Sequence, residues 1–275
     1  MKARIRFQKY GMMKFIGHLD IMRYFQKAFR RANIDSEYTK GFSPHQIMSF
    51  ASPLGVGLTS DSEYVDVQLF SSDTPEIMIE RLNAIFTEGI HVTGFHELLE
   101  QIEHQKVVTA MSLVSSADYL VSLKDGYTIS NSITTQEEFQ KAFEQYTTNV
   151  EIIIDKKTKA SEKAVDIRPM ISLVAFNKAE YLDKLRKTLQ DEEAVLLSEV
   201  RMQESVAEEY KNEIKVYLQL DTGSSINLKP ELVMEAFYDY LGLTFEKFAW
   251  QVHRLEIYTR NLEGGKLQAL DQVER

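Results

Sequence analysis

Two histidine-bearing segments near the N-terminus contain the side chains best suited to chemistry. His18 lies in Phe15-Ile-Gly-His-Leu-Asp20, and His45 ends the segment Lys40-Gly-Phe-Ser-Pro-His45. If both loops reach one edge of a sheet, the two imidazoles could act as acid and base, bind a phosphate or supply two metal ligands. The competing interpretation is structural, with His18 at a helix end and His45 bonded to loop carbonyls. We therefore assign no catalytic residue and no metal ligand.

A stripe of basic side chains follows His18. Arg23, Lys27, Arg30 and Arg31 recur at helical spacing, so they lie along one face of a helix. A solvated helix face is the usual explanation of such a stripe. Because acidic residues are absent from this face over about three turns, the stripe also indicates binding to a phosphate backbone, with a membrane surface as a third interpretation.

The first strand adds two more cations. Ala3, Ile5 and Phe7 alternate with Arg4 and Arg6, which is the period of a strand with one buried face. The arginines then lie on the face opposite the helices, where aromatic side chains of a neighbouring strand could join them. Arginines and aromatics on an open sheet are typical of modules that bind single-stranded RNA. The alternative is that a second domain or a partner protein covers this face.

These patterns define one predicted polyanion-binding surface within the first fifty residues. Its members are Arg4, Arg6, Lys14, His18, Arg23, Lys27, Arg30, Arg31, Lys40 and His45.

The distribution of charge supports an anionic partner for this surface. The chain of 275 residues has a net charge of −9. Residues 1–50 contain ten Lys and Arg against three acidic residues, a net charge of +7, which leaves −16 for the rest. A protein that repels nucleic acid as a whole thus has one end that attracts it.

Composition excludes several classes of function. The chain contains no cysteine, so it has no disulfide, no thiolate zinc site, no cysteine nucleophile and no thiolate ligand for an iron–sulfur cluster. We expect no cofactor. Because no apolar run approaches the eighteen or so residues that span a bilayer, we expect no membrane association and a cytoplasmic location.

The elements that position these residues predict an α+β fold. A strand at 2–9, a helix at 18–33, strands at 46–51 and 64–70, a helix that begins at Pro75 and a strand at 90–96 give the order β-α-β-β-α-β. This is the order of a ferredoxin-like sandwich. We assign residues 1–97 to an N-terminal ferredoxin-like domain that bears the basic surface.

The second half repeats the plan less clearly. We predict strands at 119–124 and 150–155, a helix opened by the capping box Thr135-Gln-Glu-Glu138, a helix from Pro230 to Tyr240 and a strand at 251–260. Residues 117–263 therefore form a second ferredoxin-like domain in tandem, with a helical insertion near 177–212. We expect the last dozen residues to be a mobile tail.

Several motifs together resemble a known family. The radical-SAM-linked bacterial proteins of unknown function, which occur beside or fused to a radical SAM protein with a cobalamin-binding domain, share a set of short segments with this chain. The segments are Arg4-Ile-Arg-Phe7, Lys14-Phe-Ile-Gly-His-Leu-Asp20, Phe29-Arg-Arg-Ala32, Gly41-Phe-Ser-Pro-His45, Ser49-Phe-Ala-Ser-Pro-Leu-Gly55, Glu63-Tyr-Val-Asp66, Ala164-Val-Asp-Ile-Arg-Pro169 and Asn227-Leu-Lys-Pro230. Gly17 and Ser43 depart from the family pattern.

The resemblance implies a companion role and supplies no catalytic residue. We expect a non-catalytic accessory or substrate-presenting module that binds RNA or another polyanion for a partner radical SAM enzyme. The absence of cysteine places any iron–sulfur cluster on that partner. Two alternatives remain open: a metal-independent ribonuclease resembling the ferredoxin-like proteins of CRISPR RNA processing, and an adaptor that binds only protein.

Overall fold

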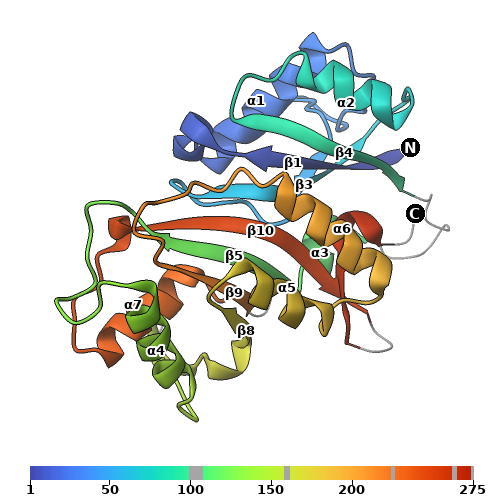
Figure 1. Ribbon diagram of the computed structural model, residues 1–275. Coiled ribbons are helices and arrows are strands. Elements are labelled where there is room, and N and C mark those ends of the chain that lie inside the picture. Colours follow the sequence, from blue (N-terminus) through green and yellow to red (C-terminus); the bar gives the residue numbers. More distant parts are fainter. Residues whose placement is uncertain (99–107, 158–161, 224–226, 262–264, 274–275) are drawn as a thin grey trace.

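The computed structural model describes residues 1–98, 108–157, 162–223, 227–261 and 265–273. Strands and helices are interspersed along the chain (Figure 1). The strands are β1 Lys2–Lys9, β2 Met48–Phe50, β3 Thr59–Gln68, β4 Ile90–Leu98, β5 Ser116–Leu123, β6 Ile153–Lys157, β7 Glu162–Asp166, β8 Ile171–Ala175, β9 Lys215–Asp221, β10 Trp250–Arg260 and β11 Leu267–Ala269. The helices are α1 His18–Arg31, α2 Pro75–Asn83, α3 Ala110–Leu113, α4 Gln136–Thr147, α5 Lys178–Arg186, α6 Glu192–Gln203 and α7 Pro230–Tyr240.

The first half has the predicted order of elements, β1-α1-β2-β3-α2-β4. Alternation in β1 turns Ile5 and Phe7 toward the apolar stripe of α1, where Phe25 and Phe29 are fully buried. The strands pair in the order β4-β1-β3, and β2 adds to β3. Both α1 and α2 cover the same face of these strands (Figure 1).

The second half is covered on both faces. Val121 and Val216 point into a core shared with α4 and α7, whereas their neighbours Leu120 and Tyr217 point into a core shared with α5. The strands pair in the order β10-β5-β9-β8. The helices of the predicted insertion, α5 and α6, therefore lie on the face opposite α4 and α7 (Figure 1).

One continuous sheet joins the two halves. β3 pairs with β10 in parallel through His253↔Thr59 and Arg254↔Ser60, which produces a mostly antiparallel sheet of nine strands. The chain is thus a mixed α and β protein. Nothing in the strand patterns predicts this junction, because it depends on residues about two hundred positions apart.

The predicted strand at 150–155 does not belong to the large sheet. Residues Ile153–Lys157 form β6, which pairs only with β7 in a separate hairpin. β8 takes the place in the large sheet, next to β9. The alternation of apolar residues was a correct sign of a strand, but it carries no information about which strand is the neighbour.

Residues 267–271 pack against the sheet, so the prediction of a mobile tail was wrong for the described part of the last dozen residues. Leu267–Ala269 form β11, which pairs with the end of β10. Leu270 and Asp271 are buried. Gly264 and Gly265 come just before this segment in the sequence, and a glycine pair is typical of a flexible end. Here the chain returns to the sheet directly after them.

Within the described residues, no helix is long and apolar enough to cross a membrane.

Candidate nucleic-acid interface

The basic stripe of α1 is exposed to solvent. The apolar side of the helix is fixed against the sheet by Ile21 and Phe25, which turns the opposite side outward. Lys27, Arg30 and Arg31 lie on that outer side and make no ion pair with the described residues. Arg23 is also exposed but pairs with Asp20, with 3.1 Å between Nη1 and Oδ1. An exposed pair of this kind adds little stability, so the guanidinium is available to a ligand.

Lys40 lies at the same end of the sheet as the last turn of α1. The chain leaves α1 at Arg31 and reaches β3 within six residues, where Glu37 N donates to Gln68 O. Gln68 is also the partner of Lys2 at the start of β1. The loop that carries Lys40 begins three residues later, and Lys40 is exposed there and forms no ion pair with any described residue.

Exposed aromatic rings accompany these cations. Phe42 is fully exposed at the tip of the Lys40 loop, and Tyr38 is exposed at the base of the same loop. Phe70 is exposed where β3 ends, and its N–H donates to Asp35 O at the return from α1. Large exposed rings next to unpaired cations are the elements with which proteins bind single-stranded nucleic acid. Tyr38 and Phe42 were not among the residues predicted from the sequence, although both flank Lys40.

The prediction that Arg4 and Arg6 form part of an open surface was wrong. Arg4 is 2% exposed, and its guanidinium contacts Asp66 Oδ1 at 2.7 Å and Leu270 O at 2.7 Å. Arg6 is 5% exposed and donates to Ser62 and Thr93. The C-terminal segment and α6 cover the face that these arginines occupy. There Arg4 pairs with Asp66 and Arg6 lies near Glu256.

Lys14 is committed to an intramolecular contact. Its ammonium pairs with Glu208 and lies 3.4 Å from Gln251 Oε1, and its side chain is only 16% exposed. This lysine connects the two halves of the protein near the start of α1. It does not extend the exposed basic surface.

His18 and His45 do not share a site. The His18 ring packs edge-on against Phe50, with 5.2 Å between ring centroids, and burial lowers the pKa of His18 below its usual value. His45 is exposed and contacts Thr39 Oγ1 at 3.1 Å. Five residues of extended chain separate His45 from Phe50, or roughly 16 Å at the rise of a strand. The two imidazoles therefore lie at opposite ends of β2.

Other titratable groups are enclosed between the sheet and α6. Arg201 of α6 contacts Glu256 Oε2 at 2.7 Å and also pairs with Asp271. Asp118 accepts hydrogen bonds from the hydroxyls of Tyr181 at 2.6 Å and Tyr258 at 3.2 Å. Burial raises the pKa of Asp118 to about 7. These groups are shielded from solvent, and no described His, Cys, Asp and Glu side chains form a cluster of three that could hold a metal ion.

The structure therefore separates the ten predicted residues into groups. Lys27, Arg30, Arg31 and Lys40 are exposed and make no ion pair within the described part of the chain. We call them, together with Tyr38, Phe42 and Phe70, the basic–aromatic surface. Arg23 and His45 lie at its margins. Arg4, Arg6, Lys14 and His18 belong to the interior or to contacts within the chain.

Comparison with known proteins identifies one family. Residues 2–230 match the model of a family described as an uncharacterized protein conserved in bacteria (DUF2344). None of the curated proteins matches the chain.

Proposed function

The chain belongs to the DUF2344 family of uncharacterized proteins conserved in bacteria, and on this premise we propose that it is a non-catalytic cytoplasmic module that binds RNA or another polyanion. The observation that carries the proposal is the basic–aromatic surface. Unpaired cations gather there on a chain of net charge −9, and exposed rings lie at the same end of the sheet.

Each part of this surface suits one feature of a single strand. Lys27, Arg30 and Arg31 offer charges at helical spacing to successive phosphates, whose counterions are released on binding. Phe42 offers a fully exposed ring on which a base can stack. Each half, with strand orders β4-β1-β3-β2 and β10-β5-β9-β8, also fits a ferredoxin-like unit, an arrangement that several RNA-binding modules use.

A radical SAM enzyme is the proposed partner. The support comes from the sequence motifs that the chain shares with radical-SAM-linked bacterial proteins, several of which lie in α1 and the loops beside it. In this proposal the basic–aromatic surface holds the polyanion and the partner performs the chemistry. The ribonuclease alternative has less support, because His18 and His45 lie at opposite ends of β2.

Fluorescence anisotropy with a labelled single-stranded oligouridine tests the proposal. We expect binding that weakens with salt, and we expect the triple variant Lys27→Gln/Arg30→Gln/Arg31→Gln to bind on the order of tenfold less tightly, with a salt slope smaller by about 2. Phe42→Ala should reduce affinity by about tenfold without changing that slope, because stacking releases no counterion.

A matched control separates local contacts from net charge. The triple variant Lys141→Gln/Lys211→Gln/Lys247→Gln removes three exposed lysines elsewhere and should bind RNA like the parent protein. Equal losses of RNA affinity in both triple variants would show that the protein attracts RNA through its overall charge and not through α1. Absence of binding at low salt would eliminate the polyanion function and leave the protein-only adaptor, and cleavage of the probe would instead favour the ribonuclease.

A further inference from the structure

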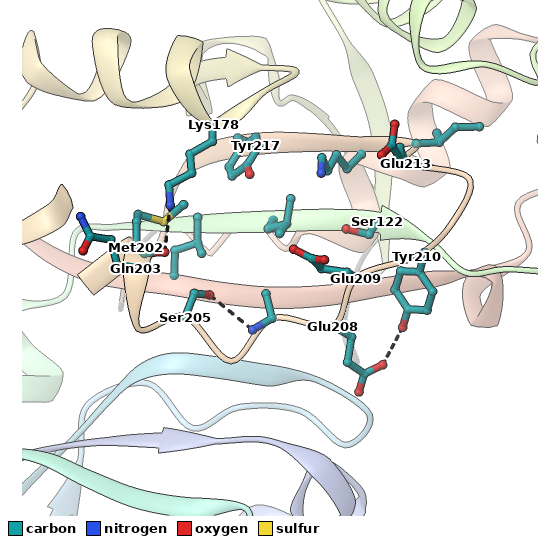
Figure 2. Close-up of a pocket in the computed structure, with 15 residues that line it drawn as sticks. Ser122, Lys178, Met202, Gln203, Ser205, Glu208, Glu209, Tyr210, Glu213 and Tyr217 are labelled. Carbon is teal, nitrogen blue, oxygen red and sulfur yellow. Dashed lines mark hydrogen bonds between the residues drawn. The ribbon is translucent and has the colours of Figure 1, made fainter. Parts of the chain in front are cut away.

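A hollow of about 400 Å³ opens on the face of the sheet opposite α4 and α7. Figure 2 shows the residues that line it. Its floor is formed by Leu120 and Ser122 of β5, Tyr217 of β9 and Leu255 of β10. The segment 204–213, which follows α6, forms one side. The hollow lies in the second half of the chain, apart from the basic–aromatic surface.

Two hydroxyl groups on the floor have no partner within the described protein. Ser122 is 7% exposed and Tyr217 is 4% exposed, yet neither hydroxyl makes a hydrogen bond there. In the same strand the hydroxyl of buried Ser116 donates to Leu220 O at 3.1 Å, as buried hydroxyls usually do. Ser122 and Tyr217 share one face on neighbouring strands as a diagonal pair, about 7 Å apart. They therefore present a polar floor that is open to a ligand.

Free charges of both signs surround this floor. The carboxylates of Glu209 and Glu213 and the ammonium of Lys215 make no ion pair with the described residues, and all three line the hollow. Glu208, in contrast, forms an ion pair with Lys14 and accepts a hydrogen bond from the hydroxyl of Tyr210. Figure 2 shows Glu209 directed across the floor rather than away from it.

Glu209 influences the electrostatics of the floor. Burial, together with the charge of Glu209, raises the pKa of Tyr217 to about 12. The hydroxyl thus stays neutral at physiological pH, and the carboxylate near it makes this part of the floor favourable for a cation.

The side of the hollow that carries Glu213 is held in a fixed shape. Glu213 has φ of +58°, a left-handed conformation that is uncommon for a residue with a side chain. Asp125 Oδ1 accepts hydrogen bonds from the backbone N–H groups of Lys211 and Asn212, and the Asn212 side chain donates to Leu123 O. These hydrogen bonds fix the backbone of the turn, so this side of the hollow has a defined shape before a ligand arrives.

We propose that this hollow binds a free α-amino acid. An ammonium group donates three hydrogen bonds and accepts none, which suits the Glu209 carboxylate and the hydroxyls of Ser122 and Tyr217. The ammonium of Lys215, which lies opposite Ser122 in the strand pairing, suits the carboxylate of the ligand. A volume of about 400 Å³ falls within the range of small-molecule sites.

Thermal unfolding tests the proposal, with each of the twenty common L-amino acids supplied singly at about 10 mM and sodium chloride as the blank. At least one amino acid should raise Tm by on the order of 3 °C, and calorimetric titration should then give one site per chain. If no amino acid raises Tm, the hollow has no such ligand and the proposal fails.

Two single-atom variants locate the site. In Tyr217→Phe and Ser122→Ala, Tm without ligand should stay unchanged, because neither hydroxyl bonds to the protein, whereas affinity should fall by on the order of tenfold. The control Ser116→Ala removes a bonded hydroxyl from the same strand, so Tm should fall and affinity should remain. Unchanged affinity in both floor variants would place the ligand elsewhere and overturn the proposal.

Derivatives of the tightest ligand test the two charges separately. The amino acid amide lacks the negative charge and the N-acetyl derivative lacks the positive charge, so each should bind at least about tenfold less tightly than the parent. Full affinity of either derivative would contradict the assignment of Glu209 and Lys215. The variant Lys27→Gln/Arg30→Gln/Arg31→Gln, which should lose affinity for RNA, should bind the amino acid normally. The two proposals can therefore fail independently.

Discussion

Three arginines neutralise carboxylates on the face of the sheet opposite α1 and α2. Arg4 pairs with Asp66, Arg6 lies 3.8 Å from Glu256, and Arg201 contacts both Glu256 and Asp271. Although burial alone would raise it, the pKa of Asp271 lies below its usual value because His96 and Arg201 stabilise the carboxylate. Removing one partner from such a group leaves an uncompensated buried charge, which costs more than an exposed ion pair contributes.

Asp118 is an enclosed carboxyl with no cationic partner among the described residues, and we predict that its titration makes stability depend on pH. Its pKa is about 7 in the folded protein against 3.8 as the ordinary value, so the folded state binds the proton more tightly. Stability should therefore fall as pH rises from about 4 to about 7, by on the order of 4 kcal/mol if the whole difference is expressed.

Urea unfolding of the wild-type protein and of Asp118→Asn at several pH values measures this contribution. The variant should gain stability relative to the wild type between pH 4 and 7, and the difference should level off above that range. Asp239→Asn removes one exposed carboxylate and controls for net charge. A difference that is independent of pH would show that Asp118 titrates as an ordinary carboxyl.

At the scale of single elements, the helices differ in how they are held. α1 and α4 bury continuous apolar stripes, whereas Ala194 is the one buried residue of α6. Leu196 and Val200 of α6 are exposed, and Arg201 ties the helix to the sheet through charge. The position of α6 thus depends on the buried carboxylates beneath it.

The N-caps of α4 and α2 provide a second prediction. Thr135 accepts a hydrogen bond from Glu138 N, and the Glu138 carboxylate accepts from Thr135 N, which completes the capping box. Thr135→Ala should therefore lower the free energy of unfolding by about 1 kcal/mol.

Thr74 is the matched control for Thr135. It occupies the N-cap of α2 but makes no side-chain cap hydrogen bond, and Pro75 follows it at the first helical position. Thr74→Ala should change the free energy of unfolding by less than about 0.5 kcal/mol in the same urea titration. Equal losses at both caps would mean that threonine conformation, and not the hydrogen bond, determines the cost.

At the scale of the whole molecule, long-range contacts join the two halves into one unit. Arg254 of β10 pairs with Glu63 of β3, and Arg4 of β1 donates to Leu270 O near the C-terminus. Because these contacts are buried and cross the junction between β3 and β10, we expect the two halves to unfold together.

Removal of residues 266–275 tests this dependence. The truncation deletes β11, fully buried Leu270 and Asp271, and it leaves Arg4 and Arg201 without one partner each. We expect a large loss of stability, on the order of 5 kcal/mol or more, detected as a lower Tm or as failure to fold. The single variant Leu270→Ala should lower the free energy of unfolding by about 2–5 kcal/mol. It tests the same loss of stability if the truncated chain cannot be purified. An unchanged Tm would restore the interpretation of this segment as a tail.

The sequence by itself determined the local features of the protein. The periodicity of β1, the amphipathic pattern of α1, the capping box of α4 and the proline at the start of α7 each depend on residues a few positions apart. The exposed stripe of Lys27, Arg30 and Arg31 could be predicted for the same reason, because the buried side of an amphipathic helix fixes its outer side.

Only the tertiary structure decided what covers each face. Arg4 and Arg6 have the same pattern in sequence whether their face is open or closed, and Asp66, Leu270 and α6 close it. Ser122 and Tyr217 lie on neighbouring strands that are almost a hundred residues apart in the sequence. No local pattern could therefore reveal the hollow whose floor they form. Alternation in a strand specifies which side chains share a face, whereas burial depends on segments that only folding brings there.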